Sequence, residues 1–447
     1  MSPARRYPET GVFYRALDRE FPMIVRGEGC WLIDDRGRRY LDACGGAYVS
    51  NLGHGVSEVS DAVAAQVRKI AYVNGTAFTN EPVEALAAEL RTLNPKGLDF
   101  AYFLSSGSEA VEAALKLARQ HWVESGKPGK HKIIARTPGY HGNTMLALSA
   151  SARGHYKKMF GPWLTPVTMI PAPYPYRCEP ASPAMTAAAL EEAILKEGAE
   201  TVAAFIAEPV GGSSTGGSVP PADYFKHVRE ICDKHSVLFV ADEVLSGSGR
   251  TGKWAAIDHF GVTPDIMTLG KGLSGGYVPL SAMIATEKVI APIAKGSGAL
   301  KHAQTFSHSP VICAAGLAAV RHIKKNALIQ RSADMGVVLH RKLKTLSSLA
   351  SIGDIRGLGL LAGIEFVADK TTKAPFPRKL KYAETFVAAA QEAGLIVWPN
   401  VGHADGENGD LVMVAPPFTI VENEIDEIVS RFKIALAATL ETCHVQP

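Results

Sequence analysis

The chain has 447 residues, of which 20% are charged and 47% are hydrophobic, and its formal net charge is +3. This length suffices for two domains with a large core, and the composition is typical of a globular protein. No block of five basic residues and no run of eighteen apolar residues occurs, which argues against a nucleic-acid partner and against a membrane span.

The six cysteines are scattered and show no CxxC spacing, so we expect reduced thiols and neither a disulfide framework nor a metal site. The first ten residues are polar and lack the apolar region of a secretory signal. Together these features predict a cytoplasmic protein.

Residues 29–34 and 40–42 are apolar runs around Asp35-Arg36-Gly37-Arg38, which predicts an antiparallel hairpin. From about residue 55 to residue 325, helix-like and strand-like segments alternate. The expected helices are 83–92, 109–123, 186–195 and 224–235, and the expected strands are 100–104, 132–136, 202–206, 237–240 and 265–269. Such alternation predicts an α/β fold with a mostly parallel sheet flanked by helices.

After residue 326 the pattern is that of a smaller α+β domain. Helices are expected over 327–349, 380–393 and 422–440, and strands over 352–357, 360–367, 395–398 and 411–414. We therefore predict three parts. They are an N-terminal segment (1–54) that joins the small domain, a large domain (55–325), and a C-terminal small domain (326–447).

Lys271 is the most informative residue, because it follows the predicted strand 265–269 and has glycine on both sides. A lysine at the end of a buried strand is costly unless it is paired or takes part in chemistry. Asp242 ends a second apolar run, 237–241. A buried amine that forms a Schiff base, with a buried carboxylate that holds a pyridinium nitrogen, is what pyridoxal phosphate requires.

The residues next to Asp242 are assigned by strand alternation. Asp242 and Glu243 point to opposite faces, so only one of them can meet the cofactor nitrogen, and we choose Asp242. Glu243 is predicted to form a structural ion pair with Arg250. Val244 returns to the face of Asp242 and can pack against the ring.

Three further segments follow predicted strands. Ser106-Gly107-Ser108 opens a helix and can bind an anion, and the alternative is a helix that is simply well capped. Tyr140, between glycine and His141, can stack on a flat ring, and the alternative is a turn with a packed tyrosine. Glu208 is either a second buried carboxylate near Lys271 or a solvated residue at a proline turn.

Together these segments resemble the class III aminotransferases, which have the type I (aspartate aminotransferase-like) fold of pyridoxal-phosphate enzymes. The resemblance covers nearly the whole chain. Its most specific part comprises Asp242-Glu243-Val244, Gly249-Arg250-Thr251-Gly252, Leu269-Gly270-Lys271-Gly272 and Gly276-Tyr277-Val278-Pro279-Leu280.

The resemblance implies an internal aldimine on Lys271 and a pair between Asp242 and the pyridinium nitrogen. The other cofactor contacts that it implies come from Ser106, Gly107, Ser108, Tyr140, His141, Glu208, Val244 and Thr305. Thr305 matches a threonine that reaches the phosphate in the neighbouring subunit, so a homodimer with its active site at the subunit interface is implied.

The substrate is less well indicated. Ornithine and 4-aminobutyrate aminotransferases carry an arginine for 2-oxoglutarate two residues before Ala-Pro-Pro, where this chain has Met413. This difference makes the chain more similar to the ω-amine:pyruvate transaminases. Tyr48 and Phe78 are expected to line the substrate pocket, with core packing as the alternative. Which arginine binds the acceptor carboxylate stays open.

The main hypothesis is a transaminase that moves an amino group from an ω-amino acid or amine to a keto acid, with pyruvate as acceptor, in two half-reactions. The alternative is another reaction on the same cofactor, namely decarboxylation, racemisation or amino-group migration. A non-catalytic binding protein is disfavoured, because Lys271, Asp242 and Glu208 are all present.

Overall fold

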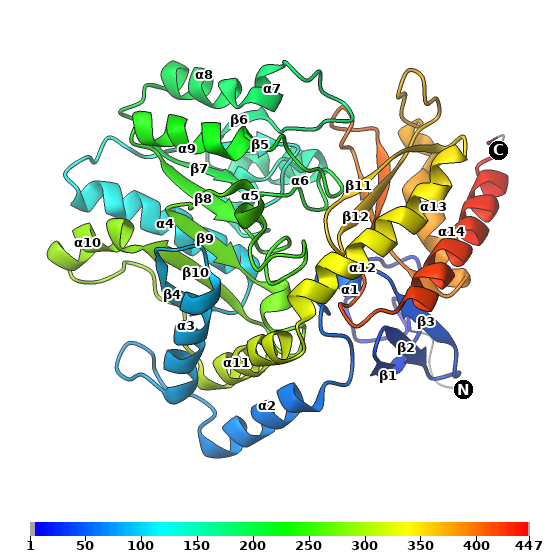
Figure 1. Ribbon diagram of the computed structural model, residues 1–447, viewed down its shortest axis with the longest axis horizontal. Helices are drawn as coiled ribbons and strands as arrows, with labels where there is room; N and C mark the ends of the chain where they lie inside the picture. The colour runs from blue at the N-terminus through cyan, green and yellow to red at the C-terminus, as the bar shows by residue number, and fades with distance from the viewer. Residues whose placement is uncertain (1–4, 446–447) are drawn as a thin grey trace.

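The computed structural model describes residues 5–445 and contains three β-sheets (Figure 1). Residues 1–4 and 446–447, which the predicted N- and C-terminal parts include, lie outside the described residues. The strand order of the largest sheet is β4 (Leu98–Leu104), β10 (Ser281–Thr286), β9 (Ile266–Leu269), β8 (Leu238–Asp242), β7 (Val202–Ala207), β5 (Lys132–Thr137) and β6 (Thr168–Pro171). β10 is antiparallel to both neighbours and all other pairs are parallel, which confirms the prediction of a mostly parallel sheet.

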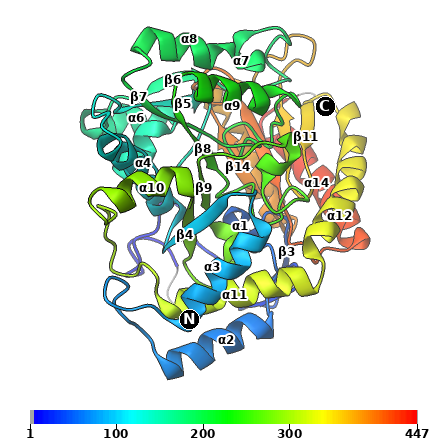
Figure 2. The ribbon, with the colours of Figure 1, turned by 60° about the vertical axis from the view of Figure 1, so that its left-hand side comes forward.

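Helices cover both faces of this sheet, because successive side chains of its buried strands point to opposite sides. In β7, Phe205 packs in the same core cluster as α8 (Ala188–Glu197) and α9 (Tyr224–Lys234). The next residue, Ile206, packs in the cluster that contains α4 (Gly107–Glu124). The two helix layers are visible in Figure 2.

The helix predicted over 186–195 begins later than expected, at Ala188. Ala187 has a φ of 62° and separates α8 from a short helix before it, α7 (Pro183–Thr186). The remaining helices of this part are α2 (Ser57–Lys69), α3 (Glu81–Leu93), α5 (Met145–Ala150), α6 (Gly154–Phe160), α10 (Glu287–Lys295) and α11 (Pro310–Lys325).

The second sheet joins the two ends of the chain. It contains β1 (Ile24–Glu28), β2 (Trp31–Asp34), β3 (Arg39–Asp42) and β13 (Leu395–Ile396). β2 and β3 form the antiparallel hairpin expected from the sequence, and β13 runs parallel to β3. Since this sheet includes a strand of the C-terminal part, the N-terminal strands lie beside α14 (Glu422–Thr442) in Figure 1.

The third sheet is antiparallel, with the order β11 (Ile352–Gly357), β12 (Ala362–Phe366), β15 (Asp410–Val414) and β14 (Trp398–Val401). The prediction of one strand over 395–398 is wrong, because the chain changes sheets at Val397, between β13 and β14. The helices of this part are α12 (Leu328–Leu343), α13 (Tyr382–Glu392) and α14. The domain boundaries at 54/55 and 325/326 stay predictions.

The topology gathers polar residues at one edge of the large sheet. β9, β8, β7 and β5 lie next to one another in this order and are all parallel. Their carboxyl ends therefore meet at the same edge of the sheet. Tyr140, Glu208, Asp242 and Lys271 end or follow these strands.

Within residues 5–445, no helix combines the length and the apolarity that a membrane crossing requires.

Candidate active site

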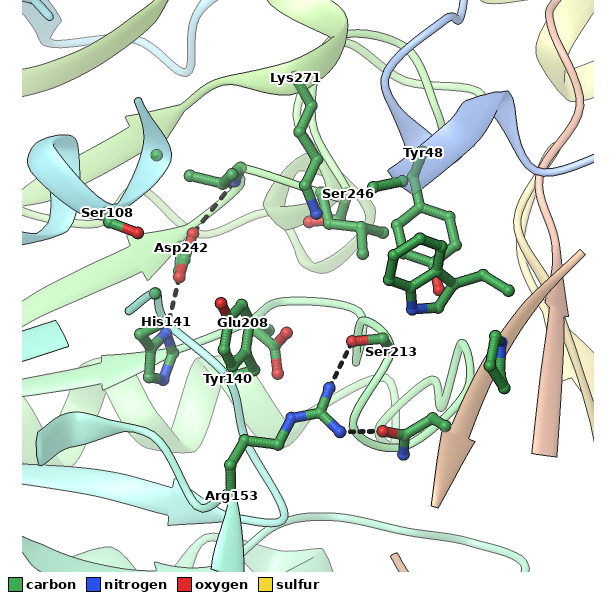
Figure 3. Close-up of a pocket in the computed structure, with 18 of the residues that line it drawn as sticks. Tyr48, Ser108, Tyr140, His141, Arg153, Glu208, Ser213, Asp242, Ser246 and Lys271 are labelled. Carbon is green, nitrogen blue, oxygen red and sulfur yellow. Dashed lines mark hydrogen bonds and ion pairs between the residues drawn. The ribbon is translucent and has the colours of Figure 1, made fainter. Parts of the chain in front are cut away.

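A cavity of about 450 Å³ lies at this edge of the large sheet. Its floor and one wall come from the loops that follow the parallel strands, and another wall comes from α1 (Gly45–Tyr48) and β14. Figure 3 shows the Lys271 amine and the Arg153 guanidinium entering the cavity from opposite sides. We refer to these two sides as the lysine end and the arginine end.

Lys271 opens a short 3₁₀ turn directly after β9 and has a φ of 44°, a left-handed conformation that is unfavourable for a residue with a side chain. No hydrogen bond or ion pair to its amine is found in the described part of the chain, and Nζ lies 5.1 Å from the ring centroid of Tyr48. Burial lowers the pKa of Lys271 to about 8, although the carboxylates of Asp242 and Glu208 oppose this shift.

Asp242 is the last residue of β8 and is held in one orientation by three neighbours. Its Oδ2 lies 2.7 Å from Nδ1 of His141. Its Oδ1 accepts hydrogen bonds from the Val244 backbone N–H at 3.1 Å and from the Thr268 hydroxyl at 3.0 Å. The side chain is 4% exposed and lines the cavity, so a fixed carboxylate is presented to whatever the cavity binds.

Glu243 points away from the cavity, as strand alternation predicted, but the expected ion pair with Arg250 is wrong. The Glu243 carboxylate accepts hydrogen bonds from the Ser246 hydroxyl at 2.6 Å and from the Ile257 backbone N–H at 2.7 Å. Arg250 donates instead to main-chain carbonyl oxygens, including that of Pro416 at 2.6 Å. Burial raises the pKa of Glu243 to about 7, because neutral donors compensate its charge only in part.

The N-terminus of α4 borders the lysine end. Gly107 and Ser108 line the cavity, whereas Ser106 does not, because its hydroxyl caps the helix by accepting from the Glu109 N–H at 3.3 Å. A Cβ built on Gly107 would come within 2.6 Å of Val244 Cγ1, so this turn has room only for bare backbone. Exposed N–H groups at a helix start favour an anion.

Tyr140, Val244 and Glu208 also line the cavity, as the sequence predicted. Glu208 is 7% exposed, and its Oε1 accepts a hydrogen bond from the Gly212 N–H at 3.2 Å. Burial raises the pKa of Glu208, with the nearby carboxylate of Asp242 acting in the same direction. Glu208 is therefore a buried carboxylate and not a solvated one.

The arginine end was not predicted from the sequence. Arg153 donates from Nη2 to the Ser213 hydroxyl at 2.7 Å and from Nη1 to the Asn400 amide oxygen. Its guanidinium carbon lies 5.2 Å from the ring centroid of Tyr140. Because these partners lie 60 and 247 positions away, no local pattern could identify them.

Tyr48 lines the cavity between the two ends and is 3% exposed. It has a φ of 66°, and its ring makes an edge contact with Trp398 at 6.3 Å between centroids. Its hydroxyl has no hydrogen-bond partner among residues 5–445. A buried phenol without a partner is costly, so its position favours a ligand that supplies one.

Phe78 and Thr305 do not line this cavity. Phe78 is 66% exposed and Thr305 is exposed as well. The two segments that carry them lie side by side, since the Asn80 amide donates to the main-chain oxygen of His308 at 3.1 Å. The expected contact of Phe78 with the pocket is thus not made within a single chain, where the side chain lies on the surface.

Known proteins are similar to this chain over nearly its whole length. The family model for aminotransferase class III matches residues 14–436. An uncharacterized aminotransferase of Bacillus subtilis (strain 168) is 38% identical over 427 residues, which cover 94% of this chain and 96% of that protein. A thermostable (S)-enantioselective omega-transaminase from Thermomicrobium roseum is 35% identical and has a TM-score of 0.90, covering 96% of this chain and 95% of its own.

A further solved structure is the omega-transaminase from Pseudomonas jessenii in complex with PMP. It is 33% identical and has a TM-score of 0.88, with 94% of this chain and 93% of that chain covered. At this level of identity and coverage the similarity extends to the fold as a whole.

Proposed function

Because this chain belongs to the class III aminotransferases, as its motifs predicted, we propose that it moves an amino group from an ω-amino acid or amine to a keto acid, with pyruvate as acceptor. The reaction would take two half-reactions, in which the deaminated donor leaves before the acceptor binds. The observation that carries the proposal is the unpaired amine of Lys271 in one cavity with the fixed carboxylate of Asp242.

The family depends on pyridoxal 5′-phosphate, and the lysine end of the cavity suits this cofactor. Asp242 presents a carboxylate for the ring nitrogen, and the amine of Lys271 is free for covalent attachment. The bare backbone at Gly107, which a side chain would block by contact with Val244, leaves the start of α4 open to a phosphate. Ser108 would add its hydroxyl to this anion site.

When bound, the cofactor supplies a carbonyl carbon that reacts with amines and a protonated ring that accepts the electrons released at the substrate carbon. Asp242 would keep the ring nitrogen protonated, since its carboxylate is buried and held by His141 and Thr268. Tyr140 and Val244 would pack against the ring.

Lys271 would move the proton at the reacting carbon. Its Nζ would remove the proton from the donor carbon as a general base and deliver it again as a general acid within the same half-reaction, and the second half-reaction would reverse these transfers. A pKa of about 8 suits both roles near neutral pH, because both protonation states are then populated. The nearby carboxylate of Glu208 would favour the protonated form of the Lys271 amine and so limit the lowering of its pKa.

We further propose a homodimer in which the exposed segment with Phe78 and Thr305 reaches the cavity of the partner. The support is that large apolar side chains gather there without cover in the single chain. Tyr72 is 45% exposed and Phe306 is 54% exposed, and their rings contact each other at 5.8 Å between centroids.

The test is a panel of amine donors and keto-acid acceptors with the reconstituted protein, read by the absorbance of pyridoxamine phosphate. With a donor and no acceptor, a transaminase stops after one turnover, and pyruvate restores turnover. Continuous turnover without an acceptor would support the alternative of a racemase, decarboxylase or aminomutase. Absence of any amine transfer with the whole panel would contradict the proposal.

A further inference from the structure

The arginine end holds a cation without an anion. Both hydrogen-bond partners of Arg153, the Ser213 hydroxyl and the Asn400 amide oxygen, are neutral. Within residues 5–445, no carboxylate forms an ion pair with this guanidinium. Glu208 is near enough to influence the pKa of Arg153 but does not pair with it, and burial lowers that pKa.

Two other arginines with little exposure, Arg356 and Arg177, are paired with acids, whereas the buried Arg250 and Arg136 donate to main-chain oxygens. Arg356 forms ion pairs with Asp354 at 2.9 Å and with Glu365 at 2.8 Å. Arg177 pairs with the same Glu365 at 2.5 Å. A guanidinium has five N–H donors in a planar fork that matches a carboxylate. Two of the five donors of Arg153 are used to fix its orientation, so others remain for a ligand.

Tyr48 adds a second indication of a polar ligand between the two ends. Its buried hydroxyl has no partner among the described residues, and the nearby Arg153 guanidinium opposes the rise in the pKa of Tyr48 that burial causes. The Tyr48 ring also lies 5.1 Å from Nζ of Lys271. A substrate that reacts at Lys271 can therefore extend along Tyr48 toward Arg153.

Position 413, where ornithine and 4-aminobutyrate aminotransferases carry a carboxylate-binding arginine, cannot bind a carboxylate in this chain. Met413 is fully buried in β15, packs with Leu361 and Leu411, and does not line the cavity. Arg15 does line the cavity, but the hydroxyl of Tyr156 is its only hydrogen-bond partner in the described part of the chain. Arg153, anchored on two sides, is the better preorganised cation.

Resting on the proposed transaminase function, we propose that Arg153 binds the carboxylate of the substrate, with Tyr48 as a further donor and with Ser213 and Asn400 as positioning residues. Both substrates would then carry a carboxylate. The acceptor would be a keto acid and the donor an amino acid. Amines and carbonyl compounds without a carboxylate would leave the guanidinium unpaired and react less well.

The experiment compares pyruvate with pyruvamide, which has the same carbonyl group and carbon chain without the charge. In the wild-type holoenzyme, kcat/KM for pyruvate exceeds that for pyruvamide. In Arg153→Met, kcat/KM for pyruvate falls by about 100-fold or more, while kcat/KM for pyruvamide changes by less than about threefold. Arg15→Met is the matched control, since it removes the other cavity arginine, and it keeps the preference for pyruvate.

A second measurement needs no variant and covers the case in which Arg153→Met fails to fold. Propionate inhibits the wild-type enzyme competitively against pyruvate at least tenfold more strongly than propionamide does. Equal inhibition by the two, an unchanged pyruvate preference in Arg153→Met, or a lost preference in Arg15→Met alone would overturn the inference. Each of these results leaves amine transfer by the wild type intact, whereas a wild type without any amine transfer would refute the proposed function together with the inference.

Discussion

The lysine end and the arginine end of the cavity are built in different ways. At the lysine end, Asp242 and Lys271 each stand at the end of a parallel strand, within a short segment that carries its own pattern. At the arginine end, Arg153, Ser213 and Asn400 come from segments far apart in the chain. The proposed chemistry thus depends on local strand-end motifs, and the proposed substrate choice depends on long-range packing.

The two ends also differ in how their charges are balanced. The Lys271 amine shares its surroundings with the carboxylates of Asp242 and Glu208. The Arg153 guanidinium has neutral hydrogen-bond partners. Charge is therefore balanced within the protein at one end and left for a ligand to balance at the other. Four predictions test this contrast, in order of decreasing effect.

The largest effect is expected at the lysine end. Lys271→Ala removes the group that would both hold the cofactor and move the proton, so turnover with an amine donor and pyruvate falls by about 1,000-fold or more. Borohydride treatment of the wild type fixes the cofactor at position 271. The control is Lys226→Ala on α9, an exposed lysine outside the cavity, which retains full activity. An unchanged rate in Lys271→Ala would refute the assignment.

Asp242→Asn should lower kcat more than tenfold, which corresponds to about 1.4 kcal/mol or more of barrier, because an amide cannot keep the ring nitrogen protonated. Glu243→Gln is a matched control on the same strand end. Its side chain does not line the cavity and accepts hydrogen bonds from Ser246 and Ile257, so kcat stays within about twofold. Equal losses in the two variants would mean that Asp242 is structural.

The pH dependence of reconstitution tests the environment of Lys271. Only the neutral amine attacks the cofactor, and with a pKa of about 8 roughly one tenth of Lys271 is neutral at pH 7. The rate of appearance of the imine absorbance should therefore rise about tenfold from pH 7 to pH 9 and then level off. A rate that continues to rise toward pH 10.5 would show that burial does not lower this pKa.

The smallest effect is expected at the arginine end. Ser213→Ala removes one of the two groups that orient Arg153, so KM for pyruvate should rise by roughly 2- to 10-fold while kcat changes little. Ser214→Ala is the control, since the Ser214 hydroxyl makes no hydrogen bond within residues 5–445. A fall in kcat without a rise in KM would place Ser213 in the chemistry and not in substrate binding.

Several structural expectations from the sequence were right because they depend on local geometry. Strand alternation placed Asp242 in the cavity and Glu243 outside it, and a well-capped helix was one of the two interpretations of the segment in which Ser106 is the cap. The mostly parallel sheet followed from the alternation of helices and strands. These features depend on residues within a few positions of each other, so a single sequence contains the information.

Other features were decided only by the tertiary structure. The chain changes sheets at Val397, Glu243 is compensated by neutral donors instead of Arg250, and Phe78 lies on the surface. Each depends on which distant segments pack together, and side-chain periodicity does not encode this. By itself the sequence determined the parallel-sheet fold and the position of Lys271 and Asp242 at the ends of two strands of that sheet. The fold alone decided that Arg153 lies in the same cavity, because its anchors become neighbours only when the sheets pack.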